Sequence, residues 1–151
     1  MDRALHMSDF FTYSSKNLVD QPVIAMNGDI ILGDGFDSID TQRLRDEKVM
    51  YSLSRYEREK PTQTCHKKNM VLAKGYQFSH DTHVFRLAEP LNETLILDKL
   101  DYPINMWGAE NAMIYTFKFD LHFTVSQVGK IASTCWHVSQ VDRMSNLLTK
   151  G

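Results

Sequence analysis

The sequence predicts a single α/β domain in which a layered, mixed sheet is flanked by helices. Short apolar runs of strand length alternate along the chain with segments whose apolar residues recur at helical spacing. The chain has 151 residues, of which 42% are hydrophobic and 24% charged, so it can bury one sizeable core but not two. We therefore expect one domain over residues 1–151 and one ligand site.

The first predicted strand covers residues 23–26, an apolar run that stops at the Asn-Gly-Asp sequence of residues 27–29. Residues 30–32 extend this strand beyond a bend. A glycine-rich stretch follows, and residues 36–45 then have the apolar spacing of a helix.

The second predicted strand covers residues 49–56, where the side chains alternate with a period close to two. Residues 57–79 are charged and weakly periodic, and we expect a mobile functional loop or an insertion there. The remaining predicted elements are a strand at 83–87, a helix at 109–118 and strands at 121–125 and 134–138.

Composition argues against several function classes. Lys and Arg number 17 against 19 Asp and Glu, so the balance of charge does not indicate a nucleic-acid partner. The two cysteines, Cys65 and Cys135, are as compatible with reduced thiols as with a disulfide, and a reducing compartment is the default expectation. Charged residues interrupt the first 15 positions, and no apolar run reaches membrane-spanning length. We expect a soluble, by default cytoplasmic, protein without a membrane segment, alone or within a larger parent protein or oligomer.

The strongest candidate for a ligand site follows the first strand. Ligands of layered α/β folds collect beyond the carboxyl ends of strands, where Asn27 and Asp29 lie. Gly28 between them allows the backbone to approach a ligand closely, and carboxylate and amide oxygens suit a divalent cation. The alternative is a simple turn in which Asp29 caps the backbone.

Glu110 opens the predicted helix at 109–118, after Trp107 and Gly108. A glutamate in a first helical turn commonly serves as a cap or as a partner of the helix dipole. Its other possible role is that of general base, because a partly buried glutamate beside an aromatic ring can have a raised pKa.

Two histidines, His80 and His83, flank Asp81 just before the strand at 83–87. Side chains of a strand alternate between its faces, so the two imidazoles would point in opposite directions. We therefore favour Asp81 as a hydrogen-bonding residue at a strand start over a histidine metal site.

His137 lies between apolar residues near the end of the chain. A single histidine on a strand is usually a core or edge residue. Together with Asp29, however, its imidazole would complete a divalent metal site that also holds a diphosphate.

Taken in order, five groups of motifs across residues 23–139 resemble those of GT-A-like glycosyltransferases, a family of nucleotide-diphospho-sugar transferases. Each motif is short, and the resemblance depends on their order. The motifs are Asn27-Gly28-Asp29-Ile30, Ser52-Leu53-Ser54-Arg55-Tyr56, Ser79-His80-Asp81, Asp101-Tyr102-Pro103 with Gly108-Ala109-Glu110-Asn111, and Trp136-His137-Val138-Ser139.

The resemblance implies a partial GT-A-like (Rossmann-like) mixed sheet and transfer of a sugar from a nucleotide-diphosphate donor to a hydroxyl acceptor, assisted by Mn²⁺ or Mg²⁺. By the same resemblance, Glu110 would be the base, and Asp29 and His137 would hold the cation. The residues implied at the donor side are Asn27, Asp29, Arg55, Asp81 and Asn111.

The chain departs from the family pattern at two points. Only residues 1–22 precede the Asn-Gly-Asp strand, so we expect a partial domain that lacks most of the nucleotide-binding portion. Asn27 also replaces an acidic residue, which weakens any direct contact with a cation. Two other functions stay open: a non-catalytic relative that binds a carbohydrate or partner, and a metal-dependent hydrolase built on His80, Asp81 and His83.

Overall fold

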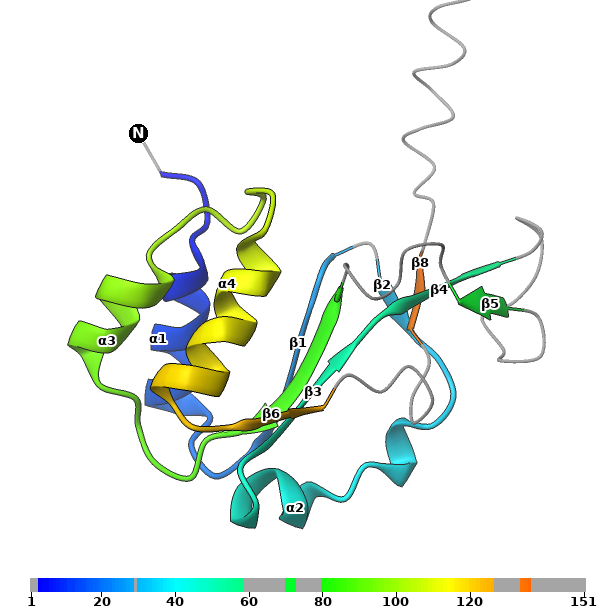
Figure 1. Cartoon of the computed structure of the whole chain (residues 1–151), viewed down its shortest axis with the longest axis horizontal. Coiled ribbons are helices and arrows are strands. Elements are labelled where there is room, and N and C mark those ends of the chain that lie inside the picture. Colours follow the sequence, from blue (N-terminus) through cyan, green and yellow to red (C-terminus); the bar gives the residue numbers. More distant parts are fainter. Residues whose placement is uncertain (1–2, 29, 59–69, 73–79, 127–133, 137–151) are drawn as a thin grey trace, which may run out of the picture.

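The computed structural model of the chain describes residues 3–28, 30–58, 70–72, 80–126 and 134–136, which form a mixed α/β fold (Figure 1). None of the described helices has the length and apolar character required to cross a membrane. The elements are α1 (Met7–Asn17), β1 (Pro22–Met26), β2 (Ile30–Leu32), a 3-10 turn (Phe36–Ser38), α2 (Thr41–Asp46), β3 (Val49–Leu53), β4 (Arg55–Arg58), β5 (Met70–Leu72), β6 (Thr82–Arg86), α3 (Glu93–Leu100), α4 (Ala109–Tyr115), a π-helical turn (Thr116–Asp120), β7 (Thr124–Ser126) and β8 (Thr134–Trp136).

The main sheet is mixed and open, with the strand order β1-β6-β3-β7. Strand β6 runs antiparallel to both β1 and β3, and β3 runs parallel to β7. Strands β1, β3 and β7 therefore point the same way, and the carboxyl ends of β1 and β3 meet at the edge of the sheet where β6 begins. A second sheet has the order β2-β8-β4-β5.

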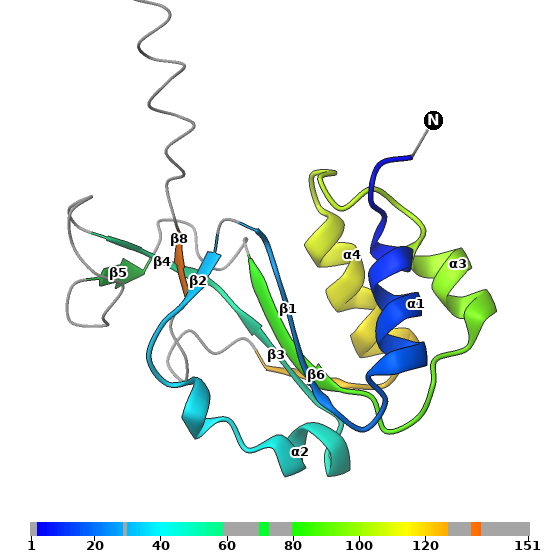
Figure 2. The ribbon, with the colours of Figure 1, turned by 180° about the vertical axis from the view of Figure 1, so that it is seen from behind.

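Helices α1, α3 and α4 cover one face of the main sheet, and α2 lies on the other side (Figures 1 and 2). On the face toward the three helices, the rings of Phe11, Phe85 and Phe117 pack with centroids 5.1 to 5.7 Å apart. Burial of such rings is the main source of stability in a domain of this size. The buried core on this side consists of Phe11, Val23, Met50, Phe85, Leu87, Ile96, Leu100, Met113, Phe117 and Phe123.

On the α2 side, Leu44 packs against Val49, Tyr51, Leu53 and Val84. Because both faces of β3 are covered, all five of its residues are buried. The alternation that predicts a strand here is therefore an alternation between two cores, and not between core and solvent.

Two predicted elements are each divided in the structure. Instead of one helix over 36–45, a 3-10 turn is followed by α2, because the side chain of Asp40 caps α2 by accepting the backbone N–H groups of Gln42 and Arg43. Instead of one strand over 49–56, the chain leaves the main sheet at Ser54 and continues as β4 in the second sheet.

Elsewhere the element boundaries shift. The strand predicted at 83–87 spans Thr82–Arg86, the helix predicted at 109–118 continues as a π-helical turn to Asp120, and the strand predicted at 121–125 is Thr124–Ser126. Within residues 57–79, β4 continues to Arg58 and pairs with β5.

The structure contains two helices that the sequence analysis does not predict. Helix α1 buries Ser8, Ser14 and Ser15 beside Phe11, which weakens its apolar periodicity. Helix α3 has a recognisable start, because the Asn92 side chain accepts the N–H groups of Thr94 and Leu95.

Candidate functional site

On the face toward α1, α3 and α4, the side chains of the main sheet are apolar at one end. Val23 of β1 pairs with Phe85 of β6. Both belong to the helix-side core, together with Met50 of β3. At this position in the sheet, packed apolar side chains fill the space toward the helices.

Toward the carboxyl ends of β1 and β3, the same face becomes polar. Two residues further along β1, Ala25 pairs with His83, which in turn pairs with Ser52 of β3. The Ser52 hydroxyl lies 3.1 Å from His83 Nδ1, and both residues are buried. Because strand side chains alternate, the next position of β1 on this face is Asn27.

Asn27 continues the strand ladder and contacts Asp81 twice. Its backbone N–H donates to the carbonyl oxygen of Asp81 at 3.1 Å, and its side-chain amide donates to Asp81 Oδ1 at the same distance. Asp81 is itself held to β3, because its N–H donates to the carbonyl of Leu53. The start of β6 is thereby fixed between the ends of β1 and β3.

Glu110 reaches the same point from the opposite layer. It lies in the first turn of α4, is half-buried, and its Oε1 lies 3.5 Å from Asn27 Nδ2. One amide therefore faces two carboxylates, those of Asp81 and Glu110, that come from a strand start and a helix start.

These three side chains line a cavity of about 150 Å³ between the sheet and the helices. Its floor includes His83, and its apolar walls come from the N-terminal segment, β1, the 101–108 segment and α4. The residues that line it are Leu5, Met7, Phe10, Ala25, Met26, Asn27, Asp81, His83, Ile104, Glu110 and Met113.

The imidazole on the floor is neutral at physiological pH. Burial, together with a smaller effect of the neighbouring His80, lowers the pKa of His83 from 6.5 to about 3. The floor therefore adds polarity to the cavity without adding a positive charge beside the two carboxylates.

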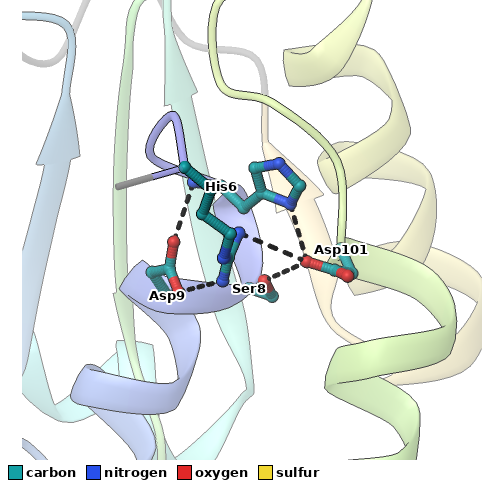
Figure 3. Close-up of polar contacts among 5 residues, drawn as sticks. His6, Ser8, Asp9 and Asp101 are labelled. Atoms are coloured by element: carbon teal, nitrogen blue, oxygen red, sulfur yellow. Dashed lines mark hydrogen bonds and ion pairs between the residues drawn. The ribbon is translucent and has the colours of Figure 1, made fainter. Parts of the chain in front are cut away.

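Polar contacts tie the N-terminal segment and the start of α1 to Asp101, which follows α3 (Figure 3). Asp101 accepts a hydrogen bond from the Ser8 hydroxyl at 2.6 Å and lies 2.7 Å from His6 Nδ1. Asp9 pairs with Arg3 and accepts the backbone N–H of His6. The contacts with Ser8 and His6 hold the pKa of Asp101 below its usual value. They join residues 3–9 to the 101–104 segment, and Leu5 and Ile104 of these segments line the cavity.

Other residues that the sequence singles out do not join this cluster in the described structure. Asn111 is exposed and is not among the lining residues. Arg55 begins β4, and its side chain lies outside the described part of the chain. Asp29 and His137, the expected cation ligands, also lie outside the described residues, as does Cys65. Trp107 does not shield Glu110, because it is fully exposed.

The described donor atoms do not by themselves fit a divalent cation. Within the described ranges, no group of three or more His, Cys, Asp or Glu residues is arranged to hold a metal ion. This finding includes His80, Asp81 and His83, the three residues on which a metal-dependent hydrolase would depend. His80 is buried, which lowers its pKa and favours its neutral form.

Sequence reasoning did not identify His83 as part of the site, nor the contribution of the N-terminal segment. The sequence predicts a role for His83 only beside His80, in a histidine metal site or a metal-dependent hydrolase. Side chains of a strand alternate between its two faces, which separates His83 from His80 but places His83 on the same face as Asp81. This alternation is the sequence signal that indicates His83 as a neighbour of Asp81. The sequence of Leu5 and Met7 contains no comparable indication, because their place in the wall depends on tertiary packing.

The chain matches no protein-family model, no curated protein and no solved structure.

Proposed function

We propose that this cavity is the sugar-transfer site of a glycosyltransferase-like domain that moves a sugar from a nucleotide-diphosphate donor to a hydroxyl acceptor. One observation supports the proposal above all. Asn27 contacts Asp81, which is 54 positions away, and Glu110, which is 83 positions away, at the carboxyl ends of β1 and β3. The three residues come from three different motifs of the resemblance to GT-A-like enzymes.

The chemistry of the group suits this reaction. Glu110 is half-buried at the cavity and carries a carboxylate that can accept the proton of an acceptor hydroxyl. The acceptor oxygen then bonds to the anomeric carbon of the donor sugar, and the bond from that carbon to the diphosphate breaks. Asp81 and Asn27 offer hydrogen-bonding groups that fix the hydroxyls of the transferred sugar.

The neutral state of His83 supports a carboxylate base. An imidazolium on the floor of the cavity would hold Asp81 and Glu110 in their ionised forms and make proton uptake less favourable. With a pKa of about 3, His83 is uncharged at the pH where transfer would occur.

The resemblance also implies a divalent cation, and the experiment below is therefore carried out with and without it. The described residues provide two carboxylates around an amide, and Asp29 and His137 lie outside them. We assign no step of the transfer to the cation.

A thermal-shift screen tests the proposal. We expect at least one donor among UDP- and GDP-linked hexoses and N-acetylhexosamines, with or without Mn²⁺, to raise the Tm of the wild-type chain. A ligand at about 100 times its Kd adds about 2.7 kcal/mol, which corresponds to a shift of several degrees.

Asp81→Asn should abolish this shift, whereas Asp37→Asn, on an exposed turn away from the cavity, should not. Glu110→Gln changes the proposed base and not the donor contacts, so it should keep the shift. The proposal fails if no donor shifts the folded wild-type protein with or without the cation. It also fails if Asp81→Asn responds like the wild type.

A further inference from the structure

The cavity that contains Glu110 is apolar over most of its lining. Leu5, Met7 and Phe10 contribute side chains from the N-terminal segment and α1, Ile104 from the segment after α3, and Met113 from α4. These groups offer a ligand contact but no hydrogen bond. A ligand that fills the cavity must therefore be apolar over most of its own surface.

Three of the apolar lining residues are also exposed to solvent and so form the rim of the cavity. The exposed fractions are 58% for Leu5, 47% for Met26 and 43% for Ile104. The N–H of Ile104 donates to the carbonyl of Leu5 at 3.2 Å, so these two rim residues are held side by side. Apolar groups gathered at the opening of a cavity are typical of a ligand site, because a ligand covers them when it binds.

The size of the cavity and the type of its side chains favour an aromatic ring. Its volume is about 150 Å³, and an apolar cavity of about this volume holds one benzene ring. The thioethers of Met7, Met26 and Met113 line it, and methionine sulfur makes favourable contacts with the edges of aromatic rings.

We propose that the acceptor is a phenol, whose single ring lies among the apolar side chains of the cavity and whose hydroxyl faces Glu110. The inference rests on the proposed function and specifies the chemical class of the acceptor.

The polar residues of the cavity select a hydroxyl on that ring. Glu110 accepts from Asn27 Nδ2 at 3.5 Å, and a carboxylate has the capacity to accept further hydrogen bonds, including one from a phenol. A ring with a negative charge would be repelled by Glu110 and Asp81. A sugar acceptor would place several hydroxyls against apolar walls that cannot satisfy them.

A phenol also suits a carboxylate base. The pKa of a phenolic hydroxyl is about 10, which is far below that of water at about 15.7, so its proton is lost more readily. Glu110 takes this proton, and the phenol oxygen bonds to the anomeric carbon of the donor sugar. The bond from that carbon to the diphosphate breaks, and its electron pair leaves with the diphosphate. The product is an aryl glycoside.

Titration calorimetry with 4-methylphenol tests the inference without any nucleotide sugar. We expect saturable binding of this probe to the full chain. Toluene, which lacks the hydroxyl, and 4-methylbenzoate, which carries a negative charge, should each bind at least about tenfold more weakly. No binding of 4-methylphenol, or equal binding of either comparison compound, would overturn the inference. Tighter binding of methyl glucoside than of 4-methylphenol would overturn it as well.

Variants of the rim connect binding to the cavity. Ile104→Asn and Leu5→Asn each place an amide where the ring would pack, and each should weaken 4-methylphenol binding about threefold or more. Leu97→Asn makes the same kind of change at an exposed position of α3 that does not line the cavity, and it should keep the wild-type affinity. Wild-type affinity in both rim variants would contradict the inference.

The outcomes separate this inference from the proposed function. If 4-methylphenol binds at the rim residues but no nucleotide sugar binds, the phenol site stands and the transferase proposal fails. If a nucleotide sugar binds and 4-methylphenol does not, the transferase proposal stands and the acceptor class is wrong.

Discussion

At Asn27, a single amide separates two carboxylates that would otherwise face one another. Its Nδ2 lies 3.1 Å from Asp81 and 3.5 Å from Glu110. The sequence suggests that an asparagine in place of an acidic residue weakens a cation site. The structure gives the amide a second role, because it donates hydrogen bonds that a carboxylate cannot donate.

Asn27→Asp should therefore destabilise the protein. The substitution removes a donor and brings a third negative charge to the cavity, and we expect the free energy of unfolding to fall by about 1–3 kcal/mol at neutral pH. Urea unfolding measures this loss.

Combining Asn27→Asp with Asp81→Asn exchanges donor and acceptor and should restore most of the lost stability. Asn105→Asp adds the same charge at an exposed position outside the cavity and serves as the matched control. If Asn27→Asp is as stable as that control, the contacts at Asn27 do not exist in solution.

His83 makes the stability of the fold sensitive to pH. Its pKa is about 3 in the folded state and 6.5 in an exposed histidine, so only the unfolded chain binds a proton between these values. Lowering the pH through this window therefore favours unfolding. We expect a loss of about 1.4 kcal/mol per pH unit, or about 2 kcal/mol between pH 6.5 and pH 5.

Urea unfolding of His83→Gln tests this expectation. The variant should show a flatter pH dependence over the same window, whatever its stability at neutral pH. His122→Asn alters an exposed histidine and serves as the matched control. An unchanged slope in His83→Gln would show that this imidazole titrates normally.

Some residues of the site could be predicted from the sequence. Asn27, Asp81 and Glu110 belong to recognisable motifs, and the structure brings their side chains into contact at the carboxyl end of β1. The state of His83 was not accessible, because a pKa shift caused by burial depends on which elements cover the residue.

At the scale of elements, the three same-direction strands begin in a similar way. A non-glycine residue with positive φ precedes each of them: Asp20 (61°) before β1, Lys48 (46°) before β3 and His122 (58°) before β7. A left-handed residue ends a helical turn and redirects the chain into the strand, a task for which glycine is normally favoured.

Lys48→Gly should therefore stabilise the protein. Relief of the left-handed strain exceeds the added flexibility of the unfolded chain, and we expect a net gain of about 0.5–1 kcal/mol by urea unfolding. Lys99→Gly, a matched change within helix α3, should cost about 0.5–1 kcal/mol. A loss of stability in Lys48→Gly would indicate that its side chain contributes more than its backbone strain costs.

The type of an element could be predicted from the sequence where the apolar pattern is strong. The residues at which the element begins and ends could not. The runs at β1 and β3 indicate strands correctly, yet nothing in residues 49–56 marks Ser54 as the point where the chain changes sheet. Helix α1 was missed because it buries three serines, and serine does not register as apolar in a periodicity analysis.

At the scale of the whole molecule, one face of the main sheet carries both the packed core that stabilises the fold and the candidate site. Val23, Met50 and Phe85 fill one end with packed apolar groups, and Asn27, Asp81 and His83 occupy the other. The mixed α/β class was predictable from the alternation of elements. The meeting of the polar residues required the strand order β1-β6-β3, which no local pattern specifies.

We propose that Glu110 acts as the base of a sugar transfer in this cavity. The most direct measurement is the release of nucleoside diphosphate from the donor found in the thermal-shift screen, with 4-methylphenol as acceptor. We predict turnover by the wild type and a decrease of about 100-fold or more in Glu110→Gln, without a change in Tm. Equal turnover by Glu110→Gln, or no turnover by a wild-type protein that binds both substrates, would contradict the claim.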